Sequence, residues 1–119
     1  MAQDRPTAAE LLAAIADFLR EEAMPALDKA APRLSFQMRV AVNSLAILER
    51  EARLGPAADA REHERLGKLL GRDGSLAELN RELARQLRAG ERDETDAALM
   101  THLEATTTDK IAIANPKWR

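Results

Sequence analysis

Apolar residues recur along most of this chain at the three- and four-residue spacing of an α-helix. The first such segment opens with Thr7 and Glu10, which are spaced as a capping box. It carries one apolar arc, made of Leu11, Leu12, Ile15, Phe18 and Leu19. We therefore predict a helix over about residues 7–23 that is stopped by Pro25.

Four further helices are expected. One begins after Pro32 and ends at Gly55-Pro56, and the next, roughly 57–70, is strongly polar at DAREHER. A second capping box, Ser75 with Glu78, opens a helix that ends at Gly90. The last starts near Thr95 or Asp96 and ends at Asn115-Pro116. Five helices with short connections predict an all-α fold, an antiparallel bundle of about five helices that forms a single helical domain over 1–119.

The helix between Pro32 and Gly55 is unusual because it is apolar on two sides. One apolar stripe consists of Phe36, Val40, Ile47 and Leu54, and the other of Met38, Ala41, Val42, Leu45 and Leu48. Between the two runs a polar stripe that contains Arg39, Asn43 and Arg50. Such a helix is either central in its bundle or has one face on the core and the other on a partner. We expect the polar stripe to be at least partly enclosed, and enclosed arginines need acceptors.

Polar residues on other helices are candidate neighbours of this stripe. Glu22 projects within the apolar arc of the first helix, while Thr106 and Lys110 share an arc with apolar residues of the last. Two interpretations stay open. The first is an internal network, with Glu22 and Thr106 as members, that fixes how the helices pack. The second is a basic pocket or groove for an anionic group of a ligand or partner. Trp118, near the chain end, is either a cover over the bundle or an interface anchor.

Composition narrows the class of protein. The chain has 119 residues, a net charge of −2, and acids and bases interspersed along its helices, which argues against nucleic-acid binding. It has no cysteine, which excludes disulfides, thiolate nucleophiles and cysteine-based metal sites. No run reaches membrane-spanning length and there is no signal segment, so we expect a cytoplasmic protein that does not bind membranes. His63 and His102 are expected to be solvated and lie in no metal motif. No phosphate loop or catalytic triad can be assembled, so we expect neither a metal, a cofactor nor a catalytic residue.

Three stretches carry a resemblance to a known family. They are RPTAAELLAAIADFL at 5–19, RVAVNSLAILERE at 39–51 and TTTDKIAIANP at 106–116. They resemble a family of small bacterial proteins of unassigned function, encoded beside acyl-CoA dehydrogenases and aminoglycoside-phosphotransferase-like kinases. The resemblance implies a non-catalytic accessory subunit of such a kinase, which acts on hydroxyacyl-CoA compounds in acyl-CoA catabolism. The implied partner is the kinase, the dehydrogenase or both.

The positions that match this family are the candidates for partner or ligand binding: Arg39, Asn43, Arg50, Lys110 and Asn115. An alternative is a small ligand-binding module, in which Arg39, Arg50 and Lys110 hold an anionic acyl-CoA-like molecule. A third hypothesis, a small enzyme with Glu22 or Lys110 as acid or base, would need a clear cavity. The sequence leaves homo-oligomerisation open.

Overall fold

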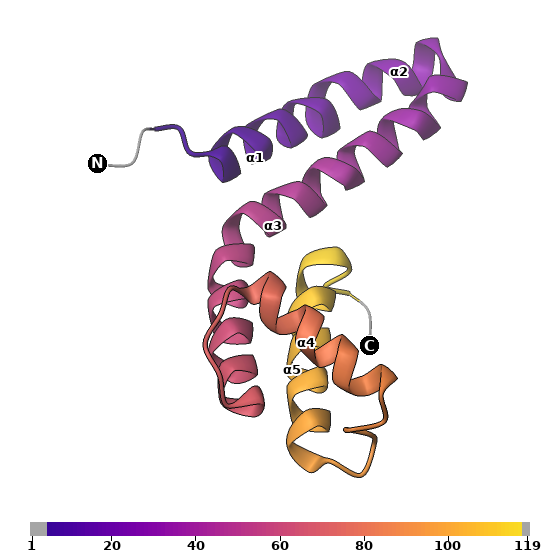
Figure 1. Cartoon of the computed structure of the whole chain (residues 1–119). Helices are drawn as coiled ribbons and strands as arrows, with labels where there is room; N and C mark the ends of the chain where they lie inside the picture. The colour runs from indigo at the N-terminus through magenta and orange to yellow at the C-terminus, as the bar shows by residue number, and fades with distance from the viewer. Residues whose placement is uncertain (1–4, 118–119) are drawn as a thin grey trace. The chain divides into compact units, whose positions relative to one another are not determined.

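The computed structural model describes residues 5–117, which form helices and short connections without a strand (Figure 1). Helices α1 (Ala8–Phe18) and α2 (Met24–Ala30) are joined by a π-helical turn, Leu19–Ala23, into one continuous helix. They are followed by α3 (Pro32–Leu70), α4 (Leu76–Arg88) and α5 (Ala97–Ala114). The all-α prediction is confirmed. The predicted number of about five helices is corrected, because the described residues form four continuous helices.

The first correction concerns Pro25, which does not stop the first helix. The turn before it is widened, so that the Met24 N–H donates to the Leu19 carbonyl five residues back. Proline has no N–H to donate and its ring crowds the preceding turn. A π-turn gives that ring room without ending the helix. The helix therefore continues to Ala30, and the backbone leaves the helical conformation at Ala31.

The second correction concerns Gly55-Pro56, where two helices were predicted and a single one is present. Pro56 lies inside α3, which is 39 residues long. A proline inside a helix removes one backbone hydrogen bond, but its fixed φ is itself helical. The flanking residues are mostly alanine, arginine, glutamate and leucine, which favour helix on both sides. Helix α3 therefore continues through this position.

The chain divides into two compact units, and α3 passes from one to the other between Leu54 and Gly55. Unit 1 contains the residues up to Leu54 together with Ile113–Asn115, and unit 2 contains Gly55–Ala112 and the residues from Pro116. In unit 1, α1 and α2 run back along the first part of α3 as an antiparallel helical hairpin (Figure 1). The hairpin turn is made by Ala31 and Pro32, a favourable first residue for α3. The single domain over 1–119 stays a prediction.

Unit 2 has a leucine core shared by its three helices. Leu66 of α3, Leu79 and Leu83 of α4, and Leu99 of α5 are at most 5% exposed and pack together. Local signals place α4 as expected. The Ser75 hydroxyl accepts the Glu78 N–H at 3.1 Å, and the Glu78 carboxylate accepts the Ser75 N–H at 2.9 Å. Both capping boxes read from the sequence are therefore present, since Thr7 and Glu10 make the same pair of bonds.

Arg92 joins the connections of unit 2 from the loop between α4 and α5. Its Nη2 donates to the Leu69 carbonyl at 2.8 Å, and its Nε donates to the Gln86 side chain at 2.6 Å. Its Nη1 lies 2.7 Å from the carboxylate of Asp96. That same carboxylate accepts the Leu99 N–H at 3.1 Å and so caps α5. One arginine thus fixes the ends of three helices.

Candidate interaction surface

The two helices of the unit 1 hairpin meet along small and medium-sized side chains. Ala16 of α1 and Ser35 and Val42 of α3 are buried, at 3–5% exposure, while Leu12 and Leu19 are half-buried. The Ser35 hydroxyl donates to the Asp28 carboxylate and ties α2 to the start of α3. These contacts, which we call the seam, include only part of the apolar arc expected from the sequence. Leu12 and Leu19 of that arc lie in the seam, while Leu11, Ile15 and Phe18 lie outside it.

Many large apolar side chains of unit 1 are exposed to solvent. We call them the outer apolar surface; each is 36–67% exposed, and they are Leu11, Ile15, Phe18, Leu34, Phe36, Val40, Ile47 and Leu48. The large apolar residues exposed in unit 2 are fewer and less exposed, at 36–40%: Leu87, Met100 and Leu103. Among the described residues, most of the exposed large apolar side chains therefore lie on the hairpin.

Helical geometry divides this surface into two patches. Leu11, Ile15 and Phe18 follow one another at four and three residues and lie to one side of the seam on α1. Because the helices are antiparallel, Leu34 and Leu48 of α3 fall on the same side of the hairpin. Phe36, Val40 and Ile47 lie on the face of α3 that is turned away from α1. The sequence left two positions open for this helix: central in its bundle, or with only one face on the core. In unit 1, one face of α3 packs against α1 and the opposite apolar face is exposed, as in the second position.

An apolar surface of this kind has a physical consequence. Soluble monomers rarely expose contiguous apolar patches larger than a few hundred Å², and those that do commonly use them to bind. Complete burial of a fully exposed phenylalanine or isoleucine side chain contributes about 1.5–3 kcal/mol. These side chains are already partly covered, so burial of either patch favours association by part of that amount for each residue. Exposed aromatic side chains such as Phe18 and Phe36 are frequent anchors of interfaces. The outer apolar surface is therefore a candidate protein-interaction surface.

The polar stripe of α3 is less enclosed than the sequence indicated. Arg39 and Asn43 are exposed, and the Arg39 guanidinium lies 3.9 Å from the Asp28 carboxylate rather than beside Glu22. Arg50 is half-buried, and its Nε donates to the Ile113 carbonyl at 2.6 Å. The guanidinium of Arg50 thus satisfies a carbonyl in the last turn of α5, where helices have carbonyls without intrahelical partners.

The other candidate residues are dispersed. Glu22 and Asn115 are exposed in unit 1, and Lys110 is exposed in unit 2. Thr106 is half-buried in unit 2 and accepts a hydrogen bond from Arg65 Nη2 at 3.1 Å. Trp118 lies outside the described residues. The structure therefore does not bring the predicted set together as one cluster within either unit.

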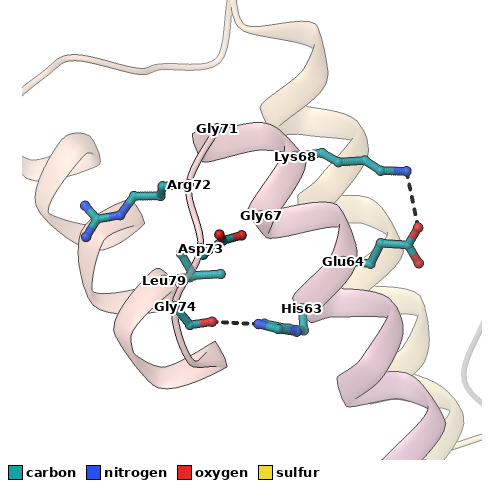
Figure 2. A pocket seen from close by; sticks show the side chains of 9 residues that line it. All are labelled: His63, Glu64, Gly67, Lys68, Gly71, Arg72, Asp73, Gly74 and Leu79. Carbon is teal, nitrogen blue, oxygen red and sulfur yellow. Dashed lines mark hydrogen bonds and ion pairs between the residues drawn. The ribbon is translucent and has the colours of Figure 1, made fainter.

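A pocket of about 620 Å³ lies in unit 2 between the end of α3 and the loop that follows it (Figure 2). His63 Nε2 is 2.7 Å from the Gly74 carbonyl oxygen, and the Asp73 carboxylate points toward α3. Lys68 is paired with Glu64 at 3.2 Å and Arg72 with Glu82 at 3.8 Å. Because the pocket is open and its cations are already paired, its charges select no particular ligand.

His102 is the residue that sequence reasoning misjudged most. It was expected to be solvated, yet it is 4% exposed and lies beside Arg65. The reason is its spacing: His102 is three residues from the buried Leu99 and so shares its face. Burial, and then the nearby charge of Arg65, lower the pKa of His102. The spacing was the signal that could have revealed it.

The fold and this surface define a class: a small, all-α protein with a helical hairpin whose outer face is apolar. More particularly, residues 25–118 match the family described as "Domain of unknown function (DUF6285)", and the chain belongs to that family. No curated protein and no solved structure matches the chain. Within residues 5–117, no helix has the length and apolar character needed to cross a membrane.

Proposed function

We propose that this protein is a non-catalytic accessory subunit, which binds a partner protein through the outer apolar surface of its helical hairpin. The observation that carries the proposal is the exposure of Phe18 and Phe36, at 56% and 67%, together with the aliphatic residues around them. A hairpin with only a narrow buried seam has little reason to keep these residues unless another surface covers them. Docking would bury the apolar side chains and leave the charged side of α3 at the rim.

The partner we propose is an aminoglycoside-phosphotransferase-like kinase that acts on hydroxyacyl-CoA compounds, with an acyl-CoA dehydrogenase of the same catabolic route as a second candidate. This choice rests on the resemblance of residues 5–19, 39–51 and 106–116. Parts of the outer apolar surface lie in the first two of these stretches, among them Phe18, Val40 and Ile47. The residues that carry the resemblance therefore include residues that an interface would use.

The competing hypothesis places an anionic acyl-CoA-like ligand on Arg39, Arg50 and Lys110. Arg50 already donates to a backbone carbonyl, and Arg39 has Asp28 nearby. Because two of the three cations already have partners, we favour the interaction surface over this ligand site.

The experiment is co-expression of the protein with an aminoglycoside-phosphotransferase-like kinase of the type that the resemblance implies, followed by size-exclusion chromatography at micromolar concentration. We expect one stable complex that elutes ahead of both free proteins. If the two proteins elute separately and kinase activity is the same with and without this chain, the kinase proposal is wrong. A larger species formed by this chain alone would instead assign the outer apolar surface to a second copy.

A further inference from the structure

A second feature of unit 2 points to a ligand rather than a protein partner. A groove of about 460 Å³ is lined by one face of α3 and the first turns of α5. From α3 it receives Arg65, Lys68 and Leu69, and from α5 it receives Ala97, Ala98, Thr101 and His102. Most of its wall is apolar. Its two cations are Lys68, which is paired with Glu64, and Arg65, and its one aromatic ring is that of His102.

Two polar atoms in the wall of this groove lack partners among the described residues. Arg65 Nε and His102 Nδ1 are both buried and make no hydrogen bond there. The His102 side chain is more than nine-tenths buried, since the residue is 4% exposed. A buried donor or acceptor left without a partner destabilises a protein. Two such atoms on residues that line one groove are the kind of defect that a bound group corrects.

Arg65 also forms no ion pair with a described carboxylate, in contrast to its neighbours on α3. One turn before Arg65, Arg61 lies 3.0 Å from the Asp109 carboxylate. Three residues after Arg65, Lys68 lies 3.2 Å from the Glu64 carboxylate. Arg65 instead donates to the neutral hydroxyl of Thr106. Of the nearby carboxylates, Asp96 is paired with Arg92, whereas Glu62 accepts only from the neutral Asn80 amide and keeps its charge, which acts on His102. A half-buried guanidinium without an ion-pair partner favours an incoming anion.

We propose that this groove binds a small organic carboxylate, whose carboxylate group pairs with Arg65 beside His102 and whose apolar portion lies over Leu69, Ala97 and Ala98. A monoanion fits because one unpaired cation, rather than a cluster, lines the groove. Arg65 Nε and His102 Nδ1 are shielded from bulk water, so the Arg65 side chain rotates to meet the ligand, as a long flexible side chain readily does. The site shares no residue with the outer apolar surface and is independent of the proposed accessory function.

The two histidines of the chain make the test direct, because His63 and His102 can be followed separately by NMR. Butyrate is titrated into the purified full-length protein, and a His63→Gln variant assigns the His102 ring signals. We expect a saturable shift of the His102 signals and a higher His102 pKa, since an anion nearby favours the charged ring. The His63 signals should not change.

Matched variants separate this site from general anion binding. Arg65→Gln should weaken butyrate binding by about tenfold or more, because a charge-assisted hydrogen bond is lost. Arg61→Gln, one turn away on α3, removes an equal charge and should leave binding unchanged. Ala98→Leu fills the exposed groove while it keeps Arg65, and should weaken binding too; it decides the matter if Arg65→Gln does not fold.

Three results would overturn the proposal. The first is the absence of a saturable His102 shift up to about 50 mM butyrate, well above a millimolar Kd. The second is an undiminished response in folded Arg65→Gln or in Ala98→Leu. The third is a stronger response to inorganic phosphate than to butyrate, which would assign the groove to phosphates instead of carboxylates.

Discussion

Phe36 offers the sharpest test of whether the outer apolar surface is free in the isolated protein. Its side chain is 67% exposed, whereas Leu66 in the core of unit 2 is 0% exposed. Complete burial of a phenylalanine contributes about 1.5–3 kcal/mol, so the buried third of Phe36 contributes about 0.5–1 kcal/mol. Alanine recovers about 0.5 kcal/mol of that loss through its higher helix propensity. We therefore expect Phe36→Ala to change the free energy of unfolding by less than about 1 kcal/mol.

Leu66→Ala is the comparison, because it removes a side chain that is enclosed by Leu79, Leu83 and Leu99. Truncation of an enclosed leucine lowers the free energy of unfolding by about 3–5 kcal/mol. The assay is urea unfolding of each variant, followed by circular dichroism at a helical wavelength. If unit 1 and unit 2 unfold in separate transitions, Leu66→Ala should shift that of unit 2. A loss above about 2 kcal/mol for Phe36→Ala would refute the reasoning, because the ring would then be packed in the free protein.

Three further predictions concern unit 2. Ser75→Ala should lower the free energy of unfolding by about 1 kcal/mol in a thermal melt, since it removes the cap that accepts the Glu78 N–H, while Ser75→Asp should retain most of the stability. Arg92→Met should cost about 3 kcal/mol in urea, because it leaves Asp96, Gln86 and the Leu69 carbonyl without their donor; a loss below about 1 kcal/mol would contradict this. Hydrogen bonds from Arg85 and Gln86 lower the pKa of Glu82 to about 2 from an ordinary value of 4.5. The stability that this ionised group adds is present above pH 4.5 and is lost as the pH falls toward 2, so Glu82→Gln should flatten acid unfolding in that window.

The sequence predicted helix starts well, because a start depends on residues that are adjacent in the chain. Thr7 with Glu10 and Ser75 with Glu78 form their capping boxes, and Asp96 caps α5 where the last helix was expected to begin. Helix ends at prolines were predicted poorly. Pro25 is passed through a π-turn and Pro56 lies inside α3, since a proline removes one hydrogen bond but does not outweigh good helix formers on both sides.

The candidate site was only partly predictable, for a different reason. That α3 has two apolar sides could be read from its spacing, and this feature underlies the outer apolar surface. Which side packs depends on the partner helix, and periodicity alone does not specify it. On α1 the seam uses Ala16 with Leu12 and Leu19, while Ile15 and Phe18 stay outside. Small residues allow two helices to approach closely, and that approach turns the larger residues outward.

The most direct test of the proposed accessory function is the Kd of the complex with the kinase for two matched variants, measured by titration calorimetry. Phe36→Glu places a charge on the outer apolar surface, and Leu87→Glu places the same charge at an exposed leucine of α4 in unit 2. Loss of an anchor residue commonly costs 2 kcal/mol or more, so Phe36→Glu should raise the Kd by about 30-fold or more. The Kd of Leu87→Glu should stay within about threefold of that of the unmodified protein. Equal Kd values for both variants, with the complex intact, would contradict docking through the hairpin.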